Sequence, residues 1–108
     1  MSYKVCGYLL SDEALLIDGL RRGFGTDETQ NARYNTIFRA TMDLMVRGEV
    51  NGTARICGVL HKGQTQRCLA LASTDPFEPF RLPSRRRIEA LKKELKTDRE
   101  PRWYTTAD

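Results

Sequence analysis

The spacing of apolar positions changes along the chain, and each change predicts an element. Residues 3–10 are rich in Tyr, Val and Leu and end at Ser11-Asp12, a favourable helix N-cap pair, so we predict a strand that runs directly into a helix over about 12–22. Gly23 and Gly25 end that helix. A second cap at Thr26-Asp27 predicts a longer helix to about residue 47, followed by Gly48 as its C-cap. Its apolar residues recur at intervals of three and four, the clearest helical period in the chain: Tyr34, Ile37, Phe38, Thr41, Leu44 and Met45.

After the turn signal Asn51-Gly52, the pattern becomes typical of strands. We predict a hairpin of residues 53–61 and 64–73 around the turn Lys62-Gly63. A two-residue turn places Cys57 opposite Cys68. Lys-Gly is a weaker turn signal than Asn-Gly, so a longer loop with a shifted register stays open.

Prolines recur too often in residues 75–83 for a helix. We predict an extended connector there, anchored by Phe77, Phe80 and Leu82. Ser84 then caps a helix over 84–96, and residues 97–108 form an aromatic and polar tail. The apolar seam of this last helix is narrow, and its basic residues are expected to point elsewhere; the seam consists of Ile88, Leu91 and Leu95.

The order of elements is strand, helix, helix, strand, strand, helix. It predicts one α+β domain over 1–108, with a small antiparallel sheet of about three strands and helices packed on one face. The first strand can pair with either strand of the hairpin. The seam of the last helix lies on its own sheet or pairs with a second copy, so the chain is a monomer or a homodimer.

Composition limits the class of protein. The chain has 108 residues, 40% hydrophobic and 30% charged, which is typical of a globular protein and not of a disordered one. No apolar run has membrane-spanning length and the start lacks a signal segment, so we expect a cytoplasmic protein with no membrane partner.

Three cysteines, an odd number, argue against a secreted disulfide framework and favour free buried thiols. Two alternatives stay open: a Cys57–Cys68 disulfide, and a zinc site formed by Cys6, Cys57, His61 and Cys68. No Cys-x-x-Cys pair supports the zinc site, so we expect neither a metal nor a cofactor. Nucleophile-elbow and phosphate-loop motifs are absent from the sequence, and we expect no enzyme.

Charge is concentrated near the carboxyl end. Residues 81–102 hold nine Lys or Arg against four acids, a net +5, whereas the rest of the chain carries −1. Such a segment favours an anionic partner. We therefore predict a small non-enzymatic protein that binds nucleic acid or a nucleoprotein through its basic C-terminal helix and aromatic tail. The predicted binding residues are Arg85, Arg86, Arg87, Lys92, Lys93, Lys96, Arg99, Arg102, Trp103 and Tyr104.

Guanidinium groups suit bidentate contacts with phosphate, and Trp103 and Tyr104 can stack on unpaired bases. Two other interpretations remain. The chain is a protein-binding adaptor or inhibitor, for example a phage-encoded modulator of a host complex, that docks on an acidic protein surface. Alternatively, the basic run is a solvated helix face, as the favourable i,i+4 pair of Glu89 and Lys93 suggests.

Overall fold

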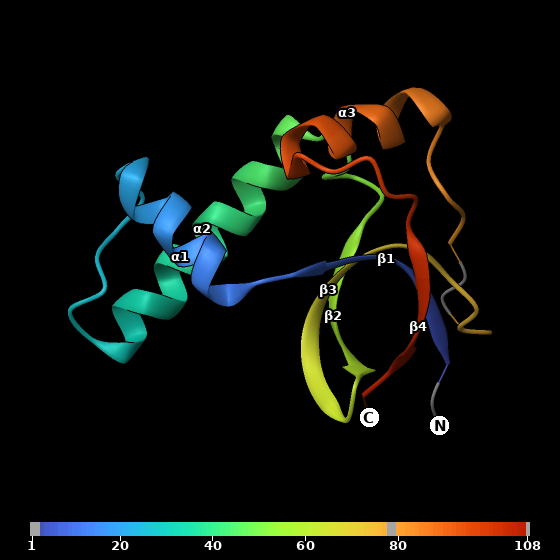
Figure 1. The fold of residues 1–108 in the computed structure, drawn as a ribbon, viewed down its shortest axis with the longest axis horizontal. Helices are drawn as coiled ribbons and strands as arrows, with labels where there is room; N and C mark the ends of the chain where they lie inside the picture. Colours follow the sequence, from blue (N-terminus) through green and yellow to red (C-terminus); the bar gives the residue numbers. More distant parts are fainter. Residues whose placement is uncertain (1–2, 78–79, 108) are drawn as a thin grey trace.

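Four antiparallel strands close into a small barrel (Figure 1). The computed structural model describes residues 3–77 and 80–107. The strands are β1 (Lys4–Leu10), β2 (Arg55–His61), β3 (Gln64–Ser73) and β4 (Arg102–Thr106), in the order β1-β3-β2-β4. The predicted α+β class and the element order are confirmed up to the third helix. The predicted open sheet of three strands is wrong, because the segment expected to be a tail supplies a fourth strand.

The β2–β3 hairpin has the predicted register. Lys62 and Gly63 form the two-residue turn, with φ values of +52° and +78°. Two consecutive positive φ values match the turns whose twist suits a hairpin. Cys57 therefore lies opposite Cys68, and the register extends along the ladder to Arg55.

Strand β4 closes the barrel by pairing with β1 on one side and β2 on the other. Its central residues are aromatic or β-branched, which favours strand structure. On the far side of β1, a bulge falls between Cys6 and Gly7. A Cβ on Gly7 would lie 1.9 Å from the carbonyl oxygen of Leu69, so only glycine allows this approach.

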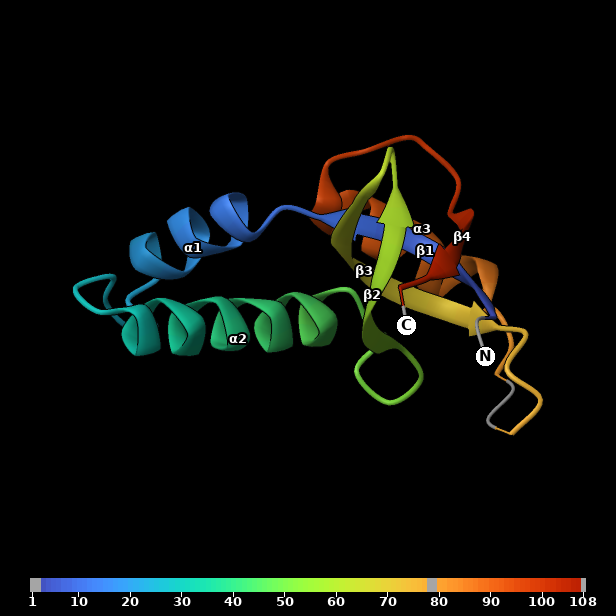
Figure 2. The same ribbon diagram turned by 90° about the horizontal axis from the view of Figure 1, so that it is seen from below.

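Helices α1 (Asp12–Arg21) and α2 (Gln30–Arg47) form an antiparallel hairpin that projects away from the barrel (Figures 1 and 2). Ser11 caps α1, as predicted, and accepts a hydrogen bond from the amide of Ala14. The predicted start of α2 is wrong: Thr29 is its N-cap, not Thr26 or Asp27. The reason is that the connection runs back along α2, where the Thr36 hydroxyl donates to the carbonyl of Thr26 over 2.8 Å.

Helix α3 (Arg85–Leu95) is capped by Ser84, as predicted, and packs on the core through Ile88, Leu91 and Leu95. The apolar seam of α3 is therefore buried against the core of its own chain. The connector before α3 differs from the prediction. Phe77 is 86% exposed and Leu82 is 46% exposed, so neither is an anchor. Phe80 does pack against the barrel interior, with its backbone bridged to Ser73.

Two apolar clusters stabilise the fold. The barrel interior is narrow and is filled by small side chains, those of Val5, Val59, Cys68 and Ala70. The larger cluster lies outside the barrel, where alternate residues such as Leu69 and Leu71 face the helices. Leu91 of α3 is fully buried in this second cluster.

Replacing Leu91 tests whether α3 is an integral part of the core. We expect Leu91→Ala to lower the free energy of unfolding by about 2–5 kcal/mol, because it removes buried methyl groups and leaves a cavity. Phe77→Ala is the control, with an expected change under about 0.5 kcal/mol since that ring is exposed. Urea denaturation followed by circular dichroism measures both, and equal effects would contradict the packing described.

Candidate functional site

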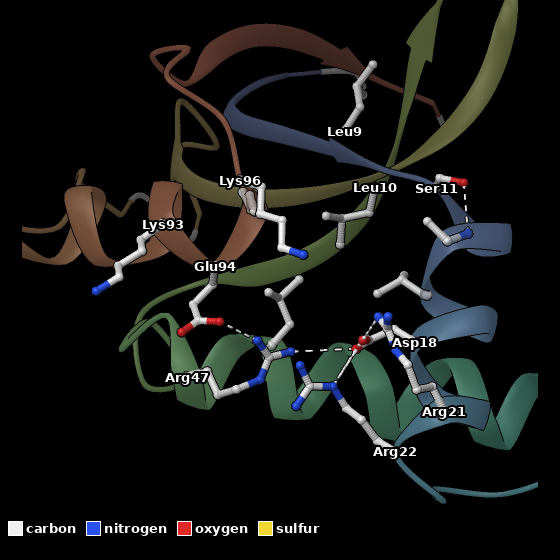
Figure 3. Close-up of a pocket in the computed structure, with 14 residues that line it drawn as sticks. Leu9, Leu10, Ser11, Asp18, Arg21, Arg22, Arg47, Lys93, Glu94 and Lys96 are labelled. Carbon is white, nitrogen blue, oxygen red and sulfur yellow. Dashed lines mark hydrogen bonds and ion pairs between the residues drawn. The ribbon is translucent and has the colours of Figure 1, made fainter.

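Two adjoining hollows lie where the helices meet the barrel. The first, the hairpin hollow, has a volume of about 310 Å³ and opens between α1, the end of α2 and the end of α3 (Figure 3). The second, the barrel-end hollow, has a volume of about 260 Å³ and lies between β1, β4 and the segment that joins α3 to β4. Leu9 and Leu95 line both hollows, so the two adjoin at these side chains, and we refer to them together as the depression.

An ion-pair network forms one wall of the hairpin hollow. Arg47 of α2 pairs with Asp43 over 2.6 Å, with Asp18 of α1 over 3.7 Å, and with Glu94 of α3. Arg22 reaches the Asp18 carboxylate over 2.9 Å (Figure 3). One guanidinium thus links all three helices.

The network also sets its own protonation states. Burial raises the pKa of Asp18, but hydrogen bonds from Arg22 and Arg21 outweigh it and hold that pKa below its usual range. Burial lowers the pKa of Arg47, but its hydrogen bonds to Asp43 and Glu94 raise it overall. The Asp18 carboxylate is therefore ionised, and the guanidinium groups beside it compensate its charge.

Two lysines line the same hollow without an ion pair among the described residues. Figure 3 shows the ammonium of Lys96 directed into the hollow, whereas that of Lys93 points outward from α3. Lys96 is the C-cap of α3 and adopts a left-handed conformation with φ of +56°. This turn directs the chain away from the helix axis and toward the barrel end.

Aromatic rings and two arginines form the barrel-end hollow. His61 and Tyr104 meet edge to face, with centroids 5.7 Å apart. Tyr8 donates a hydrogen bond from its hydroxyl to the carbonyl of Arg99 over 2.7 Å, which fixes the segment after α3. Burial, together with the nearby charge of Glu100, raises the pKa of Tyr8 to about 12, so the phenol stays a donor.

Glu100 also lines this hollow, and basic side chains of α3 compensate its negative charge. It accepts hydrogen bonds from Arg85 and from Lys92, and Arg85 also pairs with Glu89 over 2.7 Å. The hydrogen bond from Arg85, followed by that from Lys92, lowers the pKa of Glu100 to about 2. Arg99 and Arg102, in contrast, have no ion-pair partner in residues 3–77 and 80–107, and both are exposed.

The structure separates the ten predicted binding residues into three groups. Five line the hollows: Lys93, Lys96, Arg99, Arg102 and Tyr104. Three are held in ion pairs by the chain's own acids: Arg85, Arg86 (with Glu49) and Lys92. Two lie at neither hollow: Arg87 and Trp103. Lys92 was expected to point away from the core, yet it is only 8% exposed.

Trp103 and Tyr104 lie on opposite faces of β4. Successive residues of a strand face opposite sides, so Tyr104 packs against the barrel interior while Trp103 is 52% exposed on the outer face. The sequence analysis treated this segment as a tail and missed that alternation. It also missed Tyr8 and His61, which only barrel closure brings to the site.

A further surface escaped the sequence analysis. Four apolar side chains on α2 are exposed, at 40–63%: Tyr34, Phe38, Met42 and Val46. Their spacing of four residues places them along one side of the helix. We call this set the α2 stripe. The helical period indicated an apolar side but could not show how much of it the barrel leaves uncovered.

The cysteines form no metal centre in the described ranges, where no three His, Cys, Asp or Glu side chains gather closely enough to hold an ion. Cys6, Cys57 and Cys68 are free thiols in this structure. Cys57 and Cys68 are adjacent across the hairpin and share a hydrogen bond between their thiols.

Comparison with protein-family models, with curated proteins and with solved structures finds no match to this chain. In the part of the chain that the structure describes, no helix combines the length and apolar character needed to cross a membrane. A functional proposal therefore depends on the geometry and chemistry of the site.

The ion pairs of Glu100 are expected to make the free energy of unfolding depend on pH. A carboxylate with a lowered pKa stabilises the fold above its unfolded pKa of 4.5 and loses that contribution as the pH falls through about 2. We expect the free energy of unfolding to decrease over this window, and to decrease less in Glu100→Gln. Urea denaturation at successive pH values measures this, with Glu13→Gln, at an exposed helix position, as control. Identical pH profiles for Glu100→Gln and the native chain would show that the pairs contribute nothing.

Proposed function

We propose that this protein is a small non-enzymatic binding protein whose ligand is single-stranded nucleic acid, held along the two adjoining hollows. The observation that carries the proposal is the charge balance of this depression. Its acids, Asp18, Glu94 and Glu100, are each compensated by the chain's own cations, whereas four further cations line it and have no such partner in the part of the chain that the structure describes. They are Lys93, Lys96, Arg99 and Arg102.

The chemistry of the depression suits an unpaired strand better than a duplex. Proteins that bind single strands combine a positive groove for the backbone with aromatic faces for the bases. Here two lysines line the hairpin hollow and two arginines line the barrel-end hollow, which also contains the rings of Tyr104 and His61. Leu9 and Leu95, which line both hollows, offer apolar side chains to a base or a sugar.

Charge reversal within the hollows tests the proposal. We expect the native chain to bind labelled oligothymidylate and oligouridylate of about 20 nucleotides with an affinity that falls steeply with salt. The double variant Lys93→Glu with Lys96→Glu should bind more weakly. If each lysine contacts one phosphate, the slope of log affinity against log salt should become shallower by about 1.4. Fluorescence anisotropy across a salt series measures both quantities.

The matched control reverses Arg33 and Arg81, two exposed residues outside both hollows, so net charge changes equally. This control should retain most of the affinity. A second pair, Arg99→Glu with Arg102→Glu, should weaken binding as the lysine pair does. Equal losses in the control and the hollow variants would indicate a diffuse charge effect, and unchanged binding in both hollow variants would overturn the proposal.

A second candidate function is docking on another protein, and the α2 stripe favours it. Exposed apolar side chains aligned on a projecting helix are typical of helix-in-groove contacts. In pull-downs from nuclease-treated lysate, a partner that uses this face should be lost with Phe38→Asp. The same partner should be kept with Asn35→Asp, an equal charge change on the same helix, and with the lysine double variant. Partners lost on nuclease treatment would instead support nucleic-acid binding.

A further inference from the structure

Cys57 and Cys68 occupy directly opposite positions on β2 and β3. Opposite residues of an antiparallel pair have Cα atoms about 4.5–5.5 Å apart, which lies within the range of about 4.4–6.8 Å found for disulfides. Both side chains belong to the barrel interior, where Cys68 is fully buried and Cys57 packs against it from the edge. The backbone therefore already holds the two sulfurs in a position to join.

Cys57 is also reachable from solvent. It is only partly buried and lines two surface hollows, of about 400 Å³ and about 180 Å³. The smaller hollow also contains Arg55, which precedes Cys57 by two residues and therefore lies on the same face of β2. Cys68, at 0% exposure, has no such access. The pair thus combines one accessible thiol with one sheltered neighbour.

We propose that Cys57 and Cys68 form a redox-responsive pair, in which a hydroperoxide oxidises Cys57 and Cys68 then closes a reversible cross-strand disulfide. In the first step the Cys57 thiolate attacks one peroxide oxygen, the O–O bond breaks, and sulfenic acid and hydroxide (or alkoxide) form. In the second step the Cys68 sulfur attacks the Cys57 sulfur. The S–O bond breaks, and the leaving hydroxide takes the Cys68 proton to become water. The pair loses two electrons, and the peroxide gains them.

The difference in exposure assigns the two roles, because Cys57 is partly exposed whereas Cys68 is fully buried. The hydrogen bond from Cys68 lowers the pKa of Cys57, which favours the nucleophilic thiolate there. The same hydrogen bond, followed by burial, raises the pKa of Cys68, which keeps its proton until Cys57 has been oxidised. Cys6 has no opposed cysteine: it pairs with Ala72 and Trp103, and burial raises its pKa. It offers a matched third thiol that should not take part.

Mass spectrometry of the intact chain tests the proposal. After reduction, removal of the reductant and treatment with a small molar excess of hydrogen peroxide, we expect a mass loss of about 2 Da, the signature of one disulfide. Tryptic mapping should join the peptide 56–62 to the peptide 68–81, and a thiol reductant should separate them. No mass loss, or a disulfide that contains Cys6, would overturn the assignment.

Variants separate the roles of the thiols. Cys6→Ser should keep the loss of about 2 Da, and Cys68→Ala should instead leave a Cys57 sulfenic acid that dimedone traps. Cys57→Ser should leave Cys68 unoxidised at the same peroxide dose. Circular dichroism checks the fold of each variant, and the tryptic map of the native chain decides the question if a barrel variant unfolds. Equal dimedone labelling of Cys6 and Cys57 in Cys68→Ala would contradict the roles assigned.

Discussion

The closing contact between β4 and its two neighbours is the constraint on which the site depends. Residues 102–106 pair with β1 along four positions and with β2 at two, which converts a three-stranded ladder into a barrel. That pairing fixes both ends of the segment after α3, so Arg99 and Arg102 stand beside β1. Without the pairing of β4, the basic residues of this segment would have no fixed position relative to Tyr8 or His61.

Closure of the barrel also explains why the buried apolar side chains form two separate clusters. Four strands enclose only a thin interior, so most apolar side chains must be buried outside the barrel against α3 and the helical hairpin. The hollows arise at the border of this outer layer, where side chains of three helices and three strands meet but do not fill the space. The residues of the proposed binding site thus lie where packing is incomplete.

Local patterns predicted the hairpin register, the capping residues Ser11 and Ser84 and the seam of α3 because each depends on neighbours in sequence. They did not predict β4, since five residues after Pro101 show too little alternation to distinguish a strand from a tail. Charge count located the basic segment, but it could not distinguish Lys92, held by Glu100, from Lys96, directed into a hollow. That distinction requires the three-dimensional positions of acids that lie in other parts of the chain.

The role of Arg47 has a mechanical consequence. Its guanidinium joins α1, α2 and α3 at the base of the projecting hairpin. Helix α2 has 18 residues, so it is a lever arm about 27 Å long. A rotation of about 10° at that base displaces the far tip by about 5 Å. The ion pairs of Arg47 therefore help to fix the direction of this long arm relative to α3.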